Sequence, residues 1–471
     1  MLFNSPLFVL VSVFSIVCWY IMPNVIKKPV LLAYSYYFVY LLGGIWTVAT
    51  LLVVTVFTYA LSLVLEHANH KKIFLAFGIV LLVSVIIYNK YFSYVFSHIA
   101  KYLGNNSDDV SVLAMVGVSY YVFSAISYLV DIYNSKDEVD KNFLDVALWF
   151  ALYTKFIAGP IERHNELKRE LDNVKKISLN IEHVKRGMLI CALGYFYKII
   201  IADRAAIFVD DIWANLSLYS GITLVLAAIM YSLQIYFDFA GYSLIAYGIS
   251  YAMDLKIVRN FNHPYFADSV SDFWRRWHIS LSHWLRDYVY IPLGGNRKGK
   301  IRQYANLMIT FVVSGLWHGA GFNYLIWGVL HGLFQIMEKI FPFRLKISKK
   351  CNVVITFVLV SIAWIFFRAP SLGNALIFIG KMFEWNPWVL TDGTLVNQGL
   401  DLKEWIVFGV SLMLAFYVGL KQEFNVSIYH RLQSKVIIVR WIVYYAIIII
   451  LLVFGVYGSI FDANNFIYFQ Y

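Results

Sequence analysis

Long apolar runs recur along this chain of 471 residues and constrain its fold more than any other feature. Each run approaches the roughly 20 apolar residues that an α-helix needs to cross a bilayer. The clearest runs cover residues 6–22, 47–65, 73–88, 113–133, 221–250, 303–317, 353–367, 405–420 and 441–457. Only 14% of the residues are charged, whereas a soluble domain has about a quarter. The sequence therefore predicts an all-α, polytopic integral membrane protein with about a dozen membrane-embedded helices, some of them re-entrant.

Nothing in the sequence divides the chain into separate folding units. It contains no internal repeat, no low-complexity tract and no linker rich in proline or serine. Residues 1–471 are therefore predicted to form a single domain. The first 24 residues lack the basic start and the cleavage site of a signal peptide, so they are interpreted as the first membrane helix.

Basic residues outnumber acidic ones, with 39 Lys and Arg against 28 Asp and Glu. In a membrane protein this excess is first a signal of topology, because basic loops stay in the cytoplasm. Lys27, Lys28, Lys71 and Lys72 place the N-terminus outside, and a basic stretch before the last apolar run places the C-terminus outside too. No nucleic-acid partner is needed to explain the charge. The longest polar stretch, residues 160–187, is predicted to form an exposed amphipathic helix pair on the cytoplasmic side, with a solvated basic loop as the favoured alternative for most of its length.

One strongly charged segment, DFWRRWHISLSHWLRDYVYIPLGGNRKGK at residues 272–300, interrupts the apolar pattern. On a helix that turns about 100° per residue, its tryptophans and leucines share one face and its arginines share the other. The segment is therefore predicted to form a continuous amphipathic helix at the membrane surface, in contact with membrane lipids. On this helix His278 faces the apolar side, while His283 faces the same side as the arginines.

His318 lies at the end of an apolar run, in the sequence SGLWHGAGFNYLIWG, with Gly315, Gly319 and Gly321 around it. Ionisable residues inside membrane segments are costly and are often functional. Glycine lets a backbone or a substrate approach closely, and a neutral imidazole can accept a hydroxyl proton. His318 is thus a candidate general base, and the alternative is a core histidine bonded to a nearby carbonyl. His331 would face elsewhere on a continuous helix, which favours a structural role for it.

Gln234 and Asp238 lie one helical turn apart in the apolar sequence YSLQIYFDFAGYS. A buried carboxylate needs a partner, and an arginine of residues 272–300 is the expected one. A structural ion pair is favoured over a catalytic role. The sequence contains no phosphate-binding loop, no serine-hydrolase motif and no metal-ligand spacing, and its three cysteines lie far apart. No metal site is predicted.

Four stretches carry a resemblance to a known family. They are KFIAGPIERH at residues 155–164, YSLQIYFDFAGYS at 231–243, DFWRRWHISLSHWLRDYVYIPLGGN at 272–296 and GLWHGAGFNYLIWG at 315–328. Together they resemble the membrane-bound O-acyltransferases, in particular the bacterial branch of alginate and peptidoglycan O-acetyltransferases and teichoic-acid D-alanyl transfer proteins. The resemblance implies a ring of membrane helices around a central funnel, in a multi-pass protein of the bacterial cytoplasmic (inner) membrane. It also implies that His318 is the catalytic histidine and that His278 is a second catalytic residue.

The activity implied by the resemblance is O-acyl transfer across a membrane. The sequence IPLGGNRKGK is more similar to the acetyltransferases, which implies transfer of an acetyl group from a cytoplasmic thioester toward hydroxyls of an extracytoplasmic polysaccharide or peptidoglycan. Acetyl-CoA is the expected donor substrate, and no bound cofactor is expected. No stretch outside the membrane is long enough to fold into a glycan-binding module, so a separate partner is expected. The resemblance implies that this partner is an exported SGNH-type acetyltransferase.

Two other functions are kept as alternatives. The first is D-alanyl transfer to teichoic acid, which belongs to the same family. The second is a transporter or flippase for a polysaccharide precursor, which fits the number of apolar runs. Broken-helix inverted repeats would favour the transporter, and the sequence does not contain them.

Three arginines of the charged segment are candidates for binding the donor. Arg275, Arg276 and Arg286 could hold its phosphates, because a guanidinium suits bidentate phosphate recognition. Anchoring to lipid headgroups explains the same residues equally well.

The last eight residues, NNFIYFQY, are rich in aromatic side chains. One hypothesis is an aromatic belt that anchors the last helix at the outer interface. The other makes Tyr468 an acyl relay, because a phenol can carry an ester and pass it to a following nucleophile.

Overall fold

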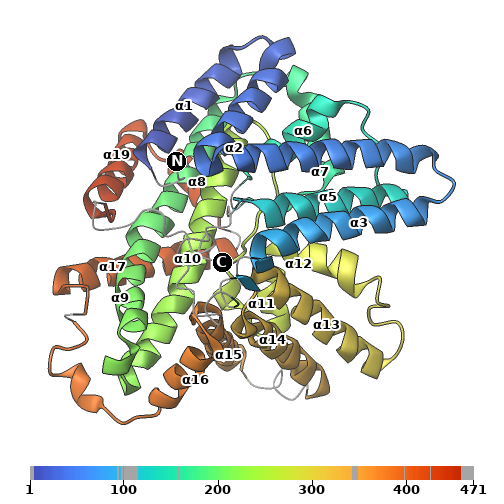
Figure 1. The fold of residues 1–471 in the computed structure, drawn as a ribbon. Helices are drawn as coiled ribbons and strands as arrows, with labels where there is room; N and C mark the ends of the chain where they lie inside the picture. The colour runs from blue at the N-terminus through green and yellow to red at the C-terminus, as the bar shows by residue number, and fades with distance from the viewer. Residues whose placement is uncertain are drawn as a thin grey trace. The chain divides into compact units, whose positions relative to one another are not determined.

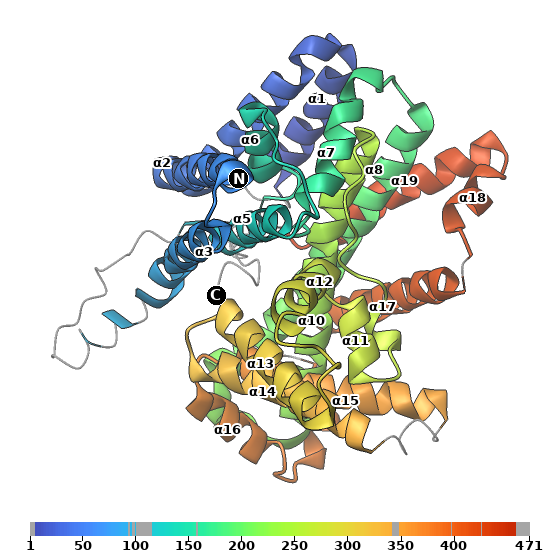
Figure 2. The ribbon, with the colours of Figure 1, turned by 90° about the vertical axis from the view of Figure 1, so that its right-hand side faces the viewer.

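The computed structural model describes residues 5–92, 95, 96, 99, 115–156, 159–341, 348–396, 398–424 and 426–457. Every regular element in these ranges is a helix (Figures 1 and 2), which confirms the all-α fold class. Contacts divide the described chain into two compact units. The first contains the described residues up to Met188 together with Ala246–Arg259, and the second contains Leu189–Ile245 and the described residues from Asn260 onward. A single domain over residues 1–471 stays a prediction.

The first unit is built around α2 (Asn24–His67), which packs against α3 (Lys71–Ile87), α5 (Val118–Tyr133) and α6 (Phe143–Ala151) (Figure 1). Helices α1 (Pro6–Ile21) and α7 (His164–Asp172) and the first part of α8 (Ile181–Tyr195) complete it. Inside α2, Gly44 has a φ of 69°. Glycine adopts this conformation freely, whereas residues with a Cβ rarely do. Helix α2 is therefore kinked, and the apolar run predicted at residues 47–65 lies after the kink.

Six helices in the described part of the chain are long and apolar enough to cross a membrane. They cover Asn24–His67, Lys71–Phe92, Gly221–Ala252, Lys349–Arg368, Leu402–Glu423 and Ile437–Phe454. Two shorter apolar helices cover Phe8–Ile21 and Leu372–Lys381. These helices support a polytopic membrane protein. A total of about a dozen, and their arrangement as a ring around a funnel, stay predictions.

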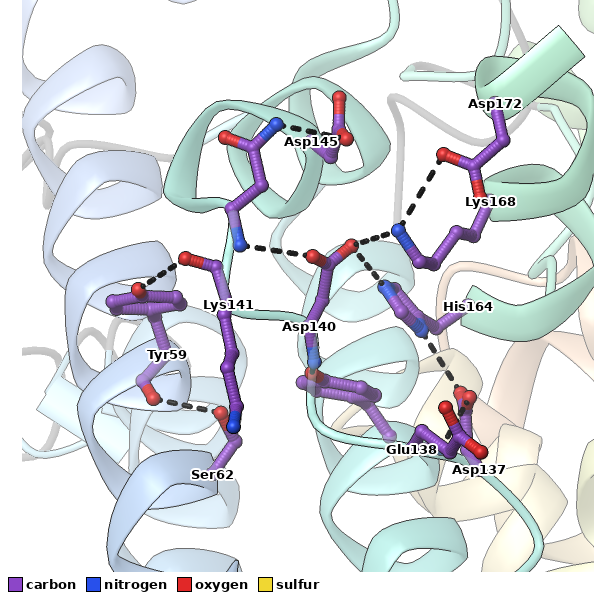
Figure 3. A network of polar contacts seen from close by, with 12 residues as sticks. Tyr59, Ser62, Asp137, Glu138, Asp140, Lys141, Asp145, His164, Lys168 and Asp172 are labelled. Atoms are coloured by element: carbon purple, nitrogen blue, oxygen red, sulfur yellow. Dashed lines mark hydrogen bonds and ion pairs between the residues drawn. The ribbon is translucent and has the colours of Figure 1, made fainter.

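A network of charged side chains ties α7 of the first unit to the loop after α5 (Figure 3). The two ring nitrogens of His164 lie 2.9 Å from Asp137 Oδ2 and 3.4 Å from Asp140 Oδ2. Lys168 Nζ lies 3.0 Å from the same Asp140 oxygen. Burial would lower the pKa of His164, but the two carboxylates outweigh burial and raise it. Burial would raise the pKa of Asp140, but hydrogen bonds from His164, Asn142 and Lys168 lower it to about 2.

The structure confirms a pair of amphipathic helices within residues 160–187 and corrects the exposure of the first residues of this stretch. Two helices do form there, α7 and the start of α8. The residues that begin this stretch are buried, however, with Glu162 only 2% exposed and His164 only 3%. Polarity alone misled the prediction, because buried charges that are paired with opposite charges are tolerated inside a protein.

The second unit contains the rest of α8, α9 (Asp203–Ala214) and most of α10 (Gly221–Ala252). Its remaining helices are α11 (Val270–Arg276), α12 (Ile279–Leu285), α13 (Lys300–His318), α14 (Phe322–Ile340), α15 (Lys349–Arg368), α16 (Leu372–Lys381), α17 (Leu402–Glu423), α18 (Ile428–Gln433) and α19 (Ile437–Phe454). Helices α13 and α14 form a hairpin, and α14 also packs on α15 (Figure 2).

Glycines let the two helices of this hairpin approach closely. A Cβ on Gly315 would lie 2.5 Å from the carbonyl oxygen of Tyr324, and a Cβ on Gly328 would overlap the carbonyl oxygen of Phe311. Neither contact can be relieved by turning a side chain, because both involve backbone oxygens. Close backbone packing therefore fixes the end of the hairpin at which His318 lies.

Candidate active site

His318 is the last residue of α13 and is only 3% exposed. Its imidazole is surrounded by aromatic rings, with centroid distances of 4.8 Å to Trp317, 4.8 Å to Trp327 and 5.4 Å to Phe367. These rings come from α13, α14 and α15, so three helices enclose the histidine. The predicted general base is thus buried at the place where the α13–α14 hairpin turns.

The hydrogen bond of His318 determines which ring nitrogen can act as a base. Nδ1 lies 2.7 Å from the carbonyl oxygen of Ser314, one turn earlier in α13. A carbonyl oxygen can only accept, so Nδ1 carries a proton and donates it. In the neutral imidazole Nε2 then carries the lone pair. This bond is the one expected of a core histidine, and it also leaves Nε2 in the form that a general base requires.

The continuous amphipathic helix predicted for the charged segment is wrong. Helix α11 ends at Arg276 and α12 begins at Ile279, and His278 between them has a φ of 42° and a ψ of 55°. The helix breaks here because its backbone forms hydrogen bonds with residues 260–262. The Asn262 N–H donates to the Arg276 carbonyl and the Ile279 N–H donates to the Asn260 carbonyl, each at 2.9 Å. These bonds replace helical ones on both sides of the break.

His278 is fully buried, as predicted, although helical periodicity is not what turns it inward. Its exposure is 0%. Its ring lies edge-on to Phe239 at 4.8 Å and lies 6.2 Å from the ring of Trp317, the neighbour of His318. Burial, reinforced by the nearby His318, lowers the pKa of His278 well below its ordinary value. A neutral His278 therefore lies near His318, while His283 is exposed as predicted.

His331 packs in the same aromatic cluster from α14. Its ring lies 5.0 Å from Trp327, and its Nδ1 accepts a hydrogen bond of 3.2 Å from the indole N–H of Trp274. The hairpin turn brings it close to the cluster, which a continuous helix would not do. Its bond to Trp274 is consistent with the structural role predicted for it.

Carboxylates lie beside all three arginines predicted to bind the donor. Arg276 bonds to Asp272 at 2.8 Å and to Glu423 at 2.8 and 3.1 Å. Arg286 donates to Asp287 at 2.7 Å, and Arg275 lies 3.2 Å from Asp272 while its side chain stays 73% exposed. Arg276 thus joins α11 to α17, and Arg275 is the most accessible of the three.

The predicted arginine partner of Asp238 is wrong, because its partner is Lys198. Lys198 Nζ lies 2.6 Å from Asp238 Oδ1 and 2.7 Å from Asp203 Oδ1, and all three side chains are at most 3% exposed. Gln234 is buried one turn before Asp238 on α10, as predicted. Sequence reasoning missed Lys198, although a lone lysine in the apolar run before Asp203 was a visible signal.

The two hypotheses for the C-terminal residues, an aromatic belt and an acyl relay at Tyr468, concern residues that the structure does not describe.

Among the residues that are described, no group of three or more His, Cys, Asp or Glu side chains could hold a metal ion. His318 and His278 are the two predicted catalytic histidines that the structure brings near one another.

Comparisons with known proteins agree with the motifs that surround this site. The model of the membrane-bound O-acyltransferase family matches residues 31–372. The chain is 35% identical over 404 residues to the probable alginate O-acetylase AlgI of Pseudomonas aeruginosa, covering 83% of this chain and 76% of that protein. It is 31% identical over 423 residues to a peptidoglycan O-acetyltransferase of Helicobacter pylori, covering 82% of this chain and 80% of that protein.

A third relative is more distant. The teichoic acid D-alanyltransferase of Bacillus subtilis is 29% identical over 250 residues, which cover 49% of this chain and 60% of that protein. All three relatives are bacterial, and the six apolar helices make this chain a multi-pass membrane protein. The family match covers most of the chain, including the four stretches that carried the resemblance. The chain therefore belongs to the membrane-bound O-acyltransferase family, and the predicted enzyme class, an O-acyltransferase, is confirmed.

Proposed function

We propose that this protein transfers an acetyl group from a cytoplasmic thioester, acetyl-CoA, toward hydroxyl groups of an extracytoplasmic polysaccharide or of peptidoglycan. The relatives that match most of the chain support acetyl transfer, since their names are alginate O-acetylase and peptidoglycan O-acetyltransferase. D-alanyl transfer is less well supported, because the relatives with that name match only about half of the chain. The cytoplasmic membrane of a bacterium is the proposed location.

The observation that carries the proposal is the hydrogen bond between His318 Nδ1 and the Ser314 carbonyl. It leaves Nε2 of the neutral ring to take the proton of an acceptor hydroxyl. The acceptor oxygen attacks the thioester carbonyl carbon, and a tetrahedral intermediate forms. When the C–S bond breaks, the thiolate takes the proton from the imidazolium and leaves as a thiol. Acetyl-CoA is a substrate in this scheme, and the acetylated acceptor is the product.

His278 has a supporting role in the proposed reaction. Its low pKa keeps the ring neutral, so it can donate one hydrogen bond and accept another. A neutral ring next to His318 can orient the acceptor hydroxyl or polarise the acyl carbonyl. This role requires the buried position that the break between α11 and α12 provides.

Arg275 is the best candidate among the arginines for the donor phosphates, because its guanidinium is mostly exposed. Arg276 and Arg286 would have to loosen their contacts with carboxylates before they could bind phosphate. An exported SGNH-type acetyltransferase is the proposed partner that carries the acetyl group onto the glycan.

Replacement of His318 tests the proposed function. A deletion strain complemented with His318→Ala or His318→Gln is expected to lose ester-linked acetate from its envelope glycans, measured after mild alkaline release. His318→Gln is the sharper variant, because its amide can still donate to the Ser314 carbonyl but cannot act as a base. His67→Gln, at a side chain that is 80% exposed, is the matched control and should acetylate normally. Normal acetate in the His318→Gln strain, with the protein present in the membrane, would refute the assignment.

A further inference from the structure

Residues 260–262 lie outside any helix and hold the break between α11 and α12. Its two backbone hydrogen bonds, from Asn262 to Arg276 and from Ile279 to Asn260, enclose Trp277 and His278. Residues with a Cβ rarely adopt a positive φ, so the conformation of His278 must be imposed by its surroundings. Asn260 is thereby fixed next to His278 in space, although it lies 18 positions earlier in the sequence.

The side chain of Asn260 has a defined orientation. Its Oδ1 accepts a hydrogen bond of 2.7 Å from Ser280 Oγ and one of 3.3 Å from the Ser280 N–H. A backbone N–H can only donate, so the atom that faces it must be the amide oxygen. The other terminal atom of Asn260 is therefore Nδ2, which carries two N–H donors.

Those two donors are buried without a hydrogen-bond partner anywhere in the described chain. Asn260 as a whole is only 2% exposed. Leaving a buried donor unsatisfied costs roughly 1–3 kcal/mol, so such groups are rare in native proteins. The amide lies next to a catalytic candidate, and its oxygen is hydrogen-bonded while its nitrogen is not. A bound substrate could accept the hydrogen bond that this nitrogen lacks.

We propose that Asn260 is a further catalytic residue, whose side-chain NH₂ donates a hydrogen bond to the carbonyl oxygen of the acyl thioester. The inference rests on the proposed function, because it assigns a partner to the reacting carbonyl. Asn260 flanks His278, and His278 approaches the ring of Trp317, which in turn contacts the ring of His318. Asn260 is thus connected to the proposed base through two intervening side chains.

The reaction gives this donor a specific task. When the acceptor oxygen attacks the carbonyl carbon, the π electrons of the C=O bond move onto the carbonyl oxygen and make it negative. A hydrogen bond from Nδ2 stabilises this charge more than it stabilises the neutral carbonyl of the substrate. When the C–S bond breaks, the electron pair returns and the C=O bond re-forms. The proton follows a separate route through His318 Nε2, so base and oxyanion donor are different groups.

Asn260→Asp is the decisive variant, because it has the same shape and keeps the oxygen that accepts from Ser280. It exchanges only the NH₂ for an oxygen. In full-length protein reconstituted into liposomes and supplied with the acceptor glycan and the exported partner, kcat for thiol release from acetyl-CoA is expected to fall roughly 10²–10³-fold at neutral pH, the usual cost of losing one oxyanion donor. KM for acetyl-CoA should stay nearly unchanged, since the bond strengthens mainly in the transition state. Asn262→Asp is the matched control, since it makes the same exchange of an amide for a carboxyl group at an exposed side chain two positions away and keeps the backbone N–H that bonds to Arg276; it should remain close to wild type.

The pH profile separates a donor from a residue that only holds the fold. When the carboxyl group introduced by Asn260→Asp is protonated, its O–H can replace the missing N–H, so the ratio of variant to wild-type kcat should rise as the pH falls. A purely structural role would leave this ratio constant. If Asn260→Asp does not reach the membrane, Asn260→Ser takes its place, because its hydroxyl can still accept from Ser280; its kcat should fall by a similar factor.

The outcomes distinguish this inference from the proposed function. A wild-type protein that releases no thiol from acetyl-CoA when the acceptor glycan and the partner are present would overturn the proposed function, and the inference with it. A wild-type protein that turns over, together with a folded Asn260→Asp variant of equal kcat, would overturn the inference alone. Equal losses in Asn260→Asp and Asn262→Asp would also overturn it, because both would then act through the segment that supports His278.

Discussion

Lys198 is a single buried cation held between the carboxylates of Asp203 and Asp238. Burying a charge is costly, and the cost is recovered only when the partners are close and well oriented. Removing one member of such a cluster lowers the free energy of unfolding, because the remaining charges stay buried without their partner. The cluster is therefore expected to stabilise the second unit, independently of the proposed chemistry.

Substitution of Lys198 tests this interpretation. Lys198→Met leaves two buried carboxylates without their cation and is expected to destabilise the protein by about 3–5 kcal/mol. Adding Asp203→Asn and Asp238→Asn should restore part of that loss, because the repelling charges are then gone. Thermal unfolding of the detergent-solubilised protein, followed by tryptophan fluorescence, measures both effects. A Lys198→Met protein that melts like wild type, or a triple variant that is less stable than the single one, would contradict the prediction.

At the scale of the elements, the sequence predicted where helices form but not which distant residues contact them. The apolar runs predicted helices correctly, because the period and length of a run are local properties of the chain. The continuous helix predicted for the segment at residues 272–300 was wrong, because its break depends on hydrogen bonds from residues 260–262 that no local pattern reveals. The partner of Asp238 was wrong for the same reason, since Lys198 lies 40 positions away and only folding brings the two together.

In the candidate site, too, local patterns were predictable and long-range contacts were not. The glycines around His318 indicated close packing, and in the structure Gly315 lies against Tyr324. Asn260 was missed, because an asparagine in a short polar loop resembles an ordinary turn residue. Its burial and its orientation become visible only in three dimensions.

The contact between α7 and the loop after α5 predicts a dependence of stability on pH (Figure 3). Both nitrogens of His164 face carboxylates, and its pKa is raised on folding despite burial. A raised pKa contributes stability that is complete below the unfolded value of about 6.5 and is lost as the pH rises through the folded value. Asp140 acts in the opposite sense, because its lowered pKa contributes stability that is lost as the pH falls from about 4 toward 2.

The expected result is a melting temperature that declines as the pH is raised from about 6.5 through the folded pKa of His164. His164→Gln, which cannot be protonated, should melt at a lower temperature and show a smaller decline over the same range. His183→Gln is a suitable control, because His183 also pairs with an aspartate but is partly exposed. The interpretation fails if wild type and His164→Gln show equal slopes while both retain their fold.

At the scale of the whole molecule, the remaining question is how an acetyl group reaches a glycan outside the membrane. The proposed donor is cytoplasmic and the proposed acceptor is not, so the group must be carried across or handed over. Tyr468 lies in the C-terminal segment predicted to be outside, and a tyrosine ester is a competent acyl donor. The relay hypothesis therefore makes a prediction about the complete protein and its partner together.

Tyr468→Phe distinguishes the relay from an aromatic anchor, because it keeps the ring and removes only the hydroxyl. Under the relay hypothesis, glycan-linked acetate should disappear while the amount of protein in the membrane stays constant. Tyr471→Phe, three positions later, is the control and should acetylate normally. Wild-type acetate in the Tyr468→Phe strain would leave the anchor as the explanation.

The place of His318 at the last position of α13 has a consequence for the charge that catalysis creates. Peptide dipoles along a helix add up to about half a negative elementary charge at its C-terminal end, which stabilises a nearby cation. When His318 takes a proton, the imidazolium forms at that end, with its Nδ1–H already bonded to a carbonyl of the same helix. The backbone thus orients the ring and stabilises the imidazolium, as an aspartate does for the histidine of a serine protease. The helix end thus supplies part of a counter-charge to the imidazolium, and it does so with backbone dipoles that carry no net charge.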